Sequence, residues 1–472
     1  METVITEPST AGLVWQKTKW IVKGCIVGLM AILFMIPMVY VKDLIREREE
    51  RQREVTNEIS SKWAGPQNIA GPVLCVPYFQ TALDADKKPT LTKHIASFLP
   101  EVLNISSTIT PIEKYRGIFK VMLYNSKTTL AGSFNKLPVE KLNIQPDKFI
   151  WAEAFVKLTL TDIKGLNEPI KLKWKDSLLE LSPQNDLNAK AGLSSTLAAA
   201  SIDDLQNVSF SAVIDLKGSE QLLFTPLGRS TIVNVNSTWK EPSFNGSSLP
   251  QSTELKDTGF VATWKSMAHT RNFPQQWVDD VVKLDAYVPP VAFTNKASIV
   301  GEVDYIRTPV DANLTPGSVS NAAFGVNLFI PVNGYQKTMR TVKYAILCIL
   351  LTFAAFFLIE TVHKKSAHPF QYGLVGLALV LFYTLLLSFS EYTGFNAAYL
   401  LASIATIGLI AWFVRGILQS TKPATILSVV LVLIYSYVFS ILQLQDYALL
   451  FGSIGLFLTL AVIMYFSRKI SW

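Results

Sequence analysis

The chain has 472 residues, of which 50% are hydrophobic and 17% are charged, and its mean hydropathy is +0.30. This composition is typical of a membrane protein, and about 300 residues outside the apolar runs leave room for one large domain or two ordinary ones. The net charge of +7 does not indicate nucleic-acid binding, because much of the excess lies in short loops beside apolar runs, where it determines topology. The expected partner is therefore the lipid bilayer and not nucleic acid.

The N-terminal part predicts a short cytoplasmic tail, one membrane span and a helix that continues out of the membrane. Residues 1–19 are polar, and residues 20–41 form an apolar run that no small-residue cleavage site follows, so an uncleaved signal anchor is expected. Residues 42–62 contain neither Gly nor Pro and alternate in charge. Glutamates placed four positions before arginines support a juxtamembrane helix in this stretch.

Residues 63–340 predict a large domain built mainly of β-strands. Runs rich in β-branched and aromatic residues are separated by Gly, Asn, Pro and Ser, and several alternate between apolar and polar positions. Such closely spaced strands predict antiparallel sheets in a sandwich or a barrel, and the division into one domain or two is left open. The expected strands are Val73–Phe79, Tyr115–Tyr124, Thr128–Phe134, Ile150–Leu160, Ile170–Trp174, Val208–Leu216, Gln221–Phe224, Thr231–Val235, Phe260–Trp264 and Gly325–Ile330.

Residues 341–472 predict a block of five membrane-spanning helices. Each of five apolar runs is near the length of about 20 residues that crosses a bilayer core, and none has an ionisable residue in its interior. Open strands or loops would leave backbone polar groups unpaired in lipid, so the runs are expected to be helical. The runs are Tyr344–Ile359, Tyr372–Phe389, Ala397–Val414, Ala424–Ile441 and Tyr447–Phe466. The predicted fold is thus six transmembrane helices, one N-terminal and five C-terminal, with a large inserted β-domain.

Small residues in the spans predict close helix packing rather than a water-filled channel. They are Gly373 and Gly376, then Ala398, Ala402 and Ala405, and then Gly452 and Gly455. Gly24 and Gly28 form a similar pair in the first span, and whether that span packs into the block is left open.

The charges of the loops between spans predict the topology. Basic residues occur in residues 360–371, after Val414 and in the C-terminal tail, whereas residues 390–396 and 442–446 contain no Lys or Arg. Basic loops stay in the cytoplasm, so both termini are predicted to be cytoplasmic and the β-domain periplasmic. The basic run that follows the first span favours the opposite orientation, but long domains translocate largely regardless of such charge.

Several segments match a known family in their loops as well as in their spans. They are RQREVTNEISSKWAGPQNIAGPVLCVPY from Arg51, Phe224–Pro250 (FTPLGRSTIVNVNSTWKEPSFNGSSLP), Gly259–Trp264 (GFVATW), Pro331–Glu360, His368–Ser403 and the stretch that begins LQDYALLFGSIG at Leu444. These segments resemble the CreD family of bacterial inner-membrane proteins, also called cell envelope integrity proteins. The resemblance implies an inner-membrane location, a large periplasmic domain, and a link to envelope stress and cell-wall antibiotics under a two-component system. It supplies neither a catalytic residue nor an established ligand.

The sequence carries no convincing enzyme motif. Walker A, HExxH and GxSxG patterns do not occur, and the four histidines lack metal-ligand spacing, so neither a metal nor a cofactor is expected. Ser133 and Lys136 fit the SxxK pattern of penicillin-binding proteins, but neither SDN nor KTG follows, and strand-like sequence flanks the serine. We interpret this match as chance.

Ionisable residues gather at the ends of the spans, which disfavours an ion-coupled transporter. Glu391 and Asp446 lie at the predicted periplasmic ends, level with Arg340 and Lys343. These charges either anchor the spans in the interface or pair with one another, which would fix the β-domain over the helices. Exposed pairs are worth only about 0–1 kcal/mol each, so such pairing would orient more than stabilise.

Aromatic residues are dense between residues 224 and 264. Trp239 and Phe244 are candidates for a groove that binds a glycan, a peptide or a lipid, although aromatic residues between turns more often belong to a β-domain core. The favoured function is a non-enzymatic envelope integrity protein whose β-domain binds or scaffolds an envelope component. The alternative is a transporter or lipid-handling protein that uses the helix bundle as a path, and the oligomeric state is left open.

Overall fold

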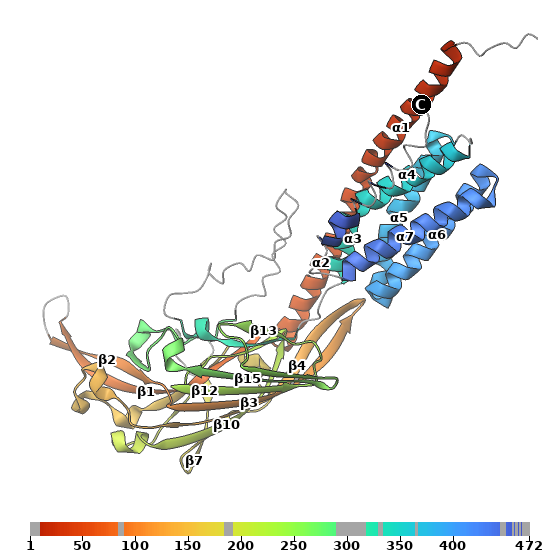
Figure 1. Ribbon diagram of the computed structural model, residues 1–472. Helices are drawn as coiled ribbons and strands as arrows, with labels where there is room; N and C mark the ends of the chain where they lie inside the picture. Colours follow the sequence, from red (N-terminus) through yellow and green to blue (C-terminus); the bar gives the residue numbers. More distant parts are fainter. Residues whose placement is uncertain are drawn as a thin grey trace, which may run out of the picture. The chain divides into compact units, whose positions relative to one another are not determined.

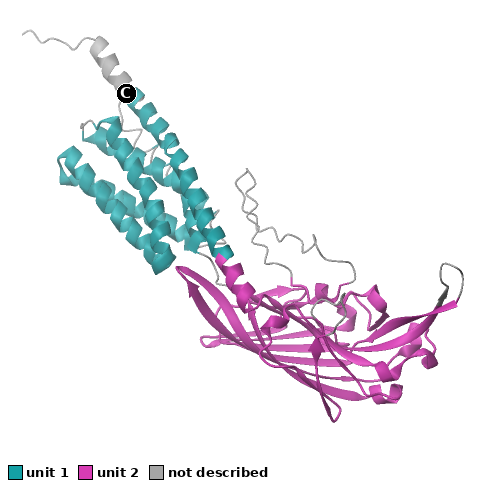
Figure 2. Cartoon of the chain, turned by 180° about the vertical axis from the view of Figure 1, so that it is seen from behind, with its two compact units in different colours: residues 1–54, 332–472 teal, residues 55–331 magenta. Residues whose placement is uncertain are grey.

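The computed structural model describes residues 10–83, 89–183, 192–288, 318–328, 334–363, 367–443, 450–455, 457, 461 and 464. The chain divides into two compact units, which Figure 2 colours separately. Residues 55–331 form the β unit, and residues 1–54 with 332–472 form the helical unit.

The β unit consists of two sheets (Figure 1). The first sheet has nine strands: seven in the order β13-β17-β11-β1-β5-β9-β8, with β2 also paired to β1 and β16 paired to β2. Its strands are β1 (Gln67–Leu83), β2 (Pro89–Phe98), β5 (Phe155–Leu160), β8 (Ser182–Pro183), β9 (Gly192–Thr196), β11 (Gln221–Phe224), β13 (Ser243–Gly246), β16 (Gln276–Val278) and β17 (Phe324–Asn327). The second sheet has eight strands in the order β14-β15-β12-β3-β4-β10-β6-β7. These are β3 (Val102–Arg116), β4 (Phe119–Phe134), β6 (Lys171–Trp174), β7 (Ser177–Glu180), β10 (Val208–Ser219), β12 (Ser230–Ser237), β14 (Ser252–Lys256) and β15 (Gly259–Met267).

One hydrophobic core joins the two sheets into a sandwich. Side chains alternate along β3, where Leu103 and Ile105 are buried and Asn104 is exposed, as the pleat of a half-buried strand requires. Residues of both sheets belong to the same buried cluster. The hydroxyl of Tyr124 on β4 also donates to the Gln221 carbonyl oxygen on β11 at 2.6 Å, which links the sheets directly.

The prediction of purely antiparallel sheets is wrong in two places. β1 pairs with β11 in parallel, and β12 pairs with β3 in parallel. Gln67 lies opposite Leu222, and Val102 lies opposite Ser230, so both pairings join segments that are far apart in the sequence. The spacing of neighbouring strands cannot reveal such pairings, because parallel partners need long crossover connections.

Two strand predictions also need correction. The expected strand Tyr115–Tyr124 is the end of β3 and the start of β4, joined by a turn in which Gly117 has φ of 59°. Glycine adopts this conformation without a Cβ penalty, so an otherwise β-rich run can reverse here. The expected strand Ile150–Leu160 begins with a 3-10 turn at Trp151–Glu153, and only β5 is extended. β3 itself was not predicted over most of its length, although its alternation of buried and exposed residues is the pattern of a half-buried strand.

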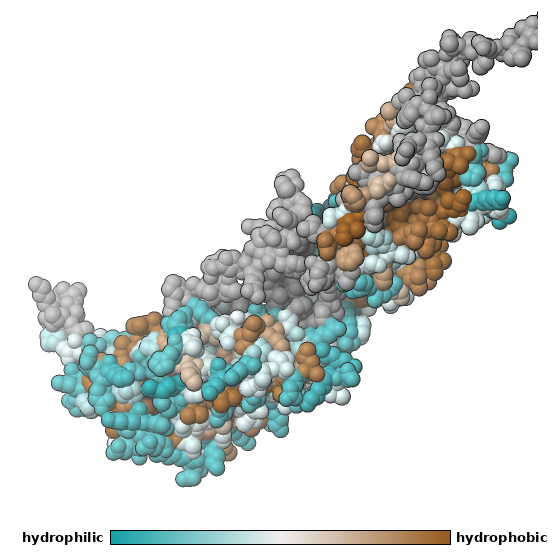
Figure 3. Space-filling view, in the orientation of Figure 1, coloured by the Kyte–Doolittle hydropathy of each residue, from teal (hydrophilic) through white to brown (hydrophobic). Residues whose placement is uncertain are grey.

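The helical unit contains the helices expected from the apolar runs and one further helix, α3, which those runs did not predict. They are α1 (Thr10–Leu33), α2 (Met35–Trp63, of which residues 35–54 belong to this unit), α3 (Gly334–Lys343), α4 (Ala345–Val362), α5 (Pro369–Thr393), α6 (Phe395–Leu418) and α7 (Thr421–Gln443). Among the described residues, five helices are long and apolar enough to cross a membrane: Val22–Trp63, α4, α5, α6 and α7. The sixth predicted span, Tyr447–Phe466, lies mostly outside the described residues. Exposed apolar side chains cover α6 and α7, as expected of a lipid-facing surface (Figure 3).

The end of α1 and the following residue, Phe34, pack into the helical unit through large side chains placed over glycines. A Cβ at Gly376 of α5 would meet the ring of Phe34, and one at Gly373 would lie 3.3 Å from Met30. Phe34 also contacts Phe353 of α4 edge-to-face, with ring centroids 6.1 Å apart. In the first span itself, a Cβ at Gly24 would lie 3.9 Å from the ring of Phe357 on α4, whereas one at Gly28 would have no neighbour within 4 Å, so the tightest contacts are at the α5 glycines.

Candidate functional site

A buried ionic network joins three helices of the helical unit. Glu360, in the last turn of α4, is fully buried and forms an ion pair with Lys23 of α1. Its Oε2 accepts a hydrogen bond of 2.6 Å from the hydroxyl of Tyr372 on α5, and its Oε1 accepts one of 2.9 Å from the Ala367 backbone N–H. Lys23 also donates to the Ala367 carbonyl oxygen at 2.7 Å. Both carboxyl oxygens of Glu360 therefore have donors.

This network lies at an end of the spans, where the sequence places the ionisable residues, but it is buried rather than exposed. Lys23 pairs with a carboxylate inside the unit, and Glu360 has no exposed surface. A buried charge is tolerated only when it is paired and hydrogen-bonded, and removing one partner of such a pair costs about 3–5 kcal/mol. The arrangement can hold the first span against α4 and α5. The sequence left this packing open, because Lys23 and Glu360 are 337 positions apart.

Glu391, one of the predicted rim residues, lies at the other end of α5. Its Oε1 accepts a hydrogen bond of 3.1 Å from the Tyr335 hydroxyl of α3 and lies 3.8 Å from Arg48 Nε of α2. Arg340 and Lys343 lie on α3, and all of these residues belong to the helical unit. Asp446 lies outside the described residues. The predicted pairing of Glu391 or Asp446 with Arg340 or Lys343, and any docking of the β unit by it, remains a prediction.

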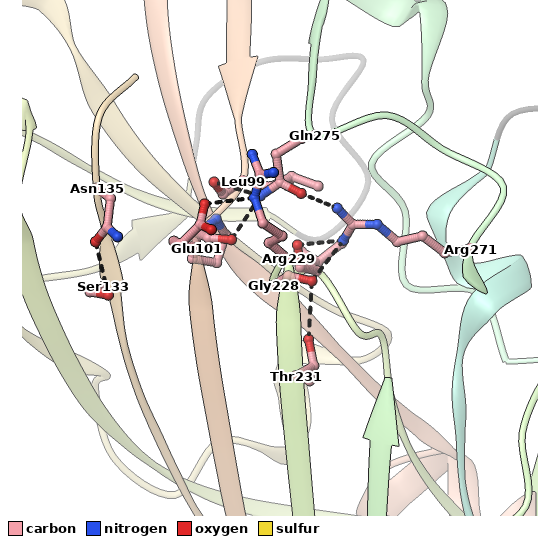
Figure 4. A network of polar contacts seen from close by, with 11 residues as sticks. Leu99, Glu101, Ser133, Asn135, Gly228, Arg229, Thr231, Arg271 and Gln275 are labelled. Atoms are coloured by element: carbon pink, nitrogen blue, oxygen red, sulfur yellow. Dashed lines mark hydrogen bonds and ion pairs between the residues drawn. The ribbon is translucent and has the colours of Figure 1, made fainter. Parts of the chain in front are cut away.

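A second polar network lies in the β unit, where the chain passes from β11 in the first sheet to β12 in the second (Figure 4). Nη1 of Arg271 donates to the carbonyl oxygens of Pro226 at 3.0 Å, Leu227 at 2.5 Å and Gly228 at 3.3 Å. Burial, with the nearby Arg229 guanidinium as a smaller cause, lowers the pKa of Arg271 to about 10. The side chain thus holds the connecting loop by hydrogen bonds to its backbone.

Neighbouring residues extend this loop-binding network. Arg271 also donates through Nη2 to Gln275 Oε1, and Gln275 in turn donates to the carbonyl oxygens of Leu99 at 3.1 Å and Pro100 at 2.8 Å. Arg229 Nε donates to Glu101 Oε2 at 2.8 Å. No motif marks Arg271 in the sequence, although the loop that it binds belongs to the FTPLGRS segment quoted above.

The candidate ligand-facing aromatic residues are half-buried and pack against the sandwich core. Phe244 contacts Phe260 and Trp264 edge-to-face, with ring centroids 5.8 and 5.5 Å apart. Trp239 donates its indole N–H to the Glu241 carbonyl oxygen at 2.8 Å. Phe244 therefore contributes to core packing, while the ligand-binding role of both residues stays a prediction.

The SxxK serine does not have the setting of a nucleophile. Ser133 lies within β4 rather than at a helix start, and its hydroxyl is 3.4 Å from Asn135 Oδ1. Lys136 is 3.6 Å from Glu140 instead. In the part of the chain that the structure describes, no three His, Cys, Asp or Glu side chains gather in a way that could hold a metal ion.

Comparison with known proteins identifies the family. The family described as "Inner membrane protein CreD" matches residues 19–472. The chain belongs to the CreD family. The inner membrane protein CreD of Escherichia coli (strain K12) is 28% identical over 445 residues, which cover 93% of this chain and 91% of that protein. The resemblance found in the sequence is therefore confirmed, and the chain is an inner-membrane protein with several apolar helices and a large β unit.

Solved structures add no argument about function. Two structures of M1 zinc metallopeptidase from Deinococcus radiodurans are 10% and 8% identical to this chain, covering 71% of it and 94% and 93% of their own chains. Their TM-scores of 0.19 and 0.20 are too low to indicate a shared fold.

Proposed function

We propose that this CreD family protein supports the integrity of the cell envelope by presenting its β unit in the periplasm, where it binds or scaffolds an envelope component. The proposed orientation places both termini in the cytoplasm. It is supported by the alternation of basic and acidic loops, because basic loops are retained on the cytoplasmic side.

The observation that carries the proposal is the continuity of α2. This helix runs from Met35, inside the apolar stretch, to Trp63, within the β unit. Inside the β unit its last turns contact the second sheet: Glu58 pairs with Arg116 of β3, and Lys217 Nζ of β10 lies 4.9 Å from the Trp63 ring centroid. The chain therefore passes from the apolar stretch into the β unit as one helix, without an intervening loop.

The outer face of the second sheet is the surface best suited to binding a component of the envelope. Register places Asn234 of β12, Ser106 of β3 and Thr129 of β4 side by side, and Thr263 of β15 lies on the other side of Asn234. Their side chains point away from the core, as the alternating burial of these strands requires. Uncharged donors and acceptors of this kind match the hydroxyl and amide groups of a glycan.

Photo-crosslinking in living cells tests the proposal. A photoreactive amino acid at Asn104, Ser106 or Asn234 is expected to capture an envelope component, whereas the same probe at Thr425 of α7, on the membrane-facing helices, is not. Capture from none of the β-unit positions, with the protein present at normal level, would contradict the binding role. A reporter that is active only in the periplasm, fused after Trp472, should be inactive, and activity would overturn the orientation.

A further inference from the structure

Three lysines lie on the outer face of the second sheet, beside the polar surface proposed above to bind an envelope component. Lys171 and Lys173 lie two positions apart on β6 and are exposed, whereas Leu172 and Trp174 of the same strand are buried in the sandwich core. Lys127 of β4 is likewise exposed, between two buried neighbours. Alternate residues of a strand point to opposite faces, so all three lysines point away from the core.

The strand register places these lysines around one residue of β10, Val213. Val213 lies opposite Lys171. Lys173 lies opposite the residue two positions before Val213, and Lys127 lies opposite the residue two positions after it. Paired residues of antiparallel strands point to the same side of a sheet. Neighbouring strands are about 4.8 Å apart, so the lysines of β4 and β6 are about 10 Å apart across the sheet, and their flexible side chains can reach one ligand over Val213.

Two carboxylates lie beside the lysines without forming an ion pair with them. Asp215 of β10 lies opposite Lys127, but its Oδ1 accepts a hydrogen bond of 2.5 Å from Asn167 Nδ2 instead. Glu180 of β7 lies opposite Lys171. None of the three lysines forms an ion pair with another described residue.

The charges of this part of the face do not cancel, because three lysines and two carboxylates leave one excess positive charge. Lys217, the next outward residue of β10, lies over the Trp63 ring and away from the cluster. Val213 is 47% exposed, and the hydroxyl-bearing residues Ser211 and Thr129 flank it. One excess positive charge matches a carboxylate better than a phosphate monoester, which carries about 1.5 to 2 negative charges at pH 7.

We propose that Lys127, Lys171 and Lys173 make this face selective for a glycan that carries carboxylate groups. The lysines bind the carboxylate, the Ser, Thr and Asn side chains of the neighbouring strands bind hydroxyl and amide groups, and Val213 lies under the apolar face of a sugar ring. A glycan is the committed ligand because a free carboxylate would leave Val213 and the polar rows uncovered. This inference rests on the binding role proposed for the β unit and specifies the charge of its ligand.

A matched pair of oligosaccharides, titrated against the purified full-length protein in nonionic detergent, tests the inference. Hexagalacturonate carries one carboxylate on each sugar, and its methyl ester has the same sugars without the charge. Exposed charge contacts change affinity by up to about fivefold each, so the acid should bind about tenfold more tightly than the ester. Raising NaCl to about 0.5 M should remove most of that difference, because salt screens exposed charges. Mannopentaose phosphate should bind less tightly than hexagalacturonate.

Variants assign the difference to the lysines of β6. Lys171→Gln with Lys173→Gln should weaken binding of the acid about tenfold and leave binding of the ester unchanged. Lys171→Arg with Lys173→Arg keeps both charges and should keep the binding. The matched control is Lys141→Gln with Lys148→Gln, which makes the same change of net charge in the two 3-10 turns that follow β4, outside the second sheet, and should bind normally.

Asp215→Asn gives a gain that damage to the fold cannot produce. Removing one carboxylate raises the excess positive charge, so the acid should bind about twofold to threefold more tightly and the ester as before. Equal affinities for acid and ester, an equal loss in the Lys141 and Lys148 control, or tighter binding of mannopentaose phosphate would overturn the selectivity while leaving glycan binding in place. If neither form of hexagalacturonate bound, the glycan surface itself would be contradicted, and crosslinking from Ser106 and Asn234 would show whether another envelope component is bound.

Discussion

The two units of this protein stabilise buried charge in different ways. In the helical unit, Glu360 is fully buried and is matched by a cation, Lys23, from another helix. In the β unit, Arg271 is only partly buried and is matched by backbone carbonyl oxygens of a loop. A membrane interior offers no water to a lone ion, so an opposite charge is needed there, whereas dipoles and some solvent suffice in the sandwich. This difference between an ion pair and hydrogen bonds to the backbone predicts how much stability each unit loses when one partner is removed.

The largest effect is expected from Lys23→Met, which leaves the Glu360 carboxylate buried without its cation. We expect a loss of about 3–5 kcal/mol in stability, because breaking a buried pair leaves an uncompensated charge. Unfolding of the full-length protein in mixed detergent micelles measures this loss. Adding Glu360→Gln to Lys23→Met should restore most of the stability. If the double variant were as unstable as the single one, the charge pair would not be the cause.

A loss of about 2 kcal/mol is expected from Arg271→Ala, since the carbonyl oxygens of residues 226–228 lose a charged donor. Pulse proteolysis of the full-length protein in urea would follow the unfolding of the β unit. Arg229→Gln is the control, because it removes the half-exposed pair with Glu101 and should cost less than about 1 kcal/mol. Equal losses in the two variants would show that the loop does not depend on Arg271.

Close packing in the helical unit is tested by Gly376→Leu. The added side chain would meet the ring of Phe34, and overpacking of this kind costs about 1–3 kcal/mol. Thermal unfolding in detergent should show the loss, whereas Gly28→Leu, which has open space, should leave the midpoint nearly unchanged. A larger effect at Gly28 would mean that the first span is held through its own glycines.

The smallest change in stability is expected from a substitution at Glu220, between β10 and β11, and this change is a gain rather than a loss. Burial raises the pKa of this carboxyl group, so folding favours its protonated form. The stability that the protonated Glu220 contributes is fully present below the pKa of the carboxyl group in the unfolded chain. It is lost as the pH rises through the raised pKa of the folded protein. Glu220→Gln should therefore raise the thermal midpoint at pH 7, by no more than about 3 °C, and should leave it unchanged at low pH. A lower midpoint at pH 7 would contradict this assignment.

Local sequence patterns were sufficient for most of the helices. Apolar runs near 20 residues predicted α4 to α7, and the helical charge pattern after Val41 predicted that the first span continues as a helix. The break between α1 and α2 lies near Pro37, which has no N–H to donate to the Leu33 carbonyl oxygen. These features depend on residues within one or two turns of each other, so a single sequence contains them.

Contacts between distant segments were decided only by the tertiary structure. The amino-acid sequence by itself determined that the chain has a membrane-spanning part and a β-rich part, because hydropathy and alternation are local properties. It did not determine that β1 pairs with β11 in parallel, that Arg271 binds the loop after β11, or that Lys23 meets Glu360. Such contacts form between residues far apart in the chain, and they depend on which of many compatible surfaces pack together. Packing of the whole molecule makes that selection.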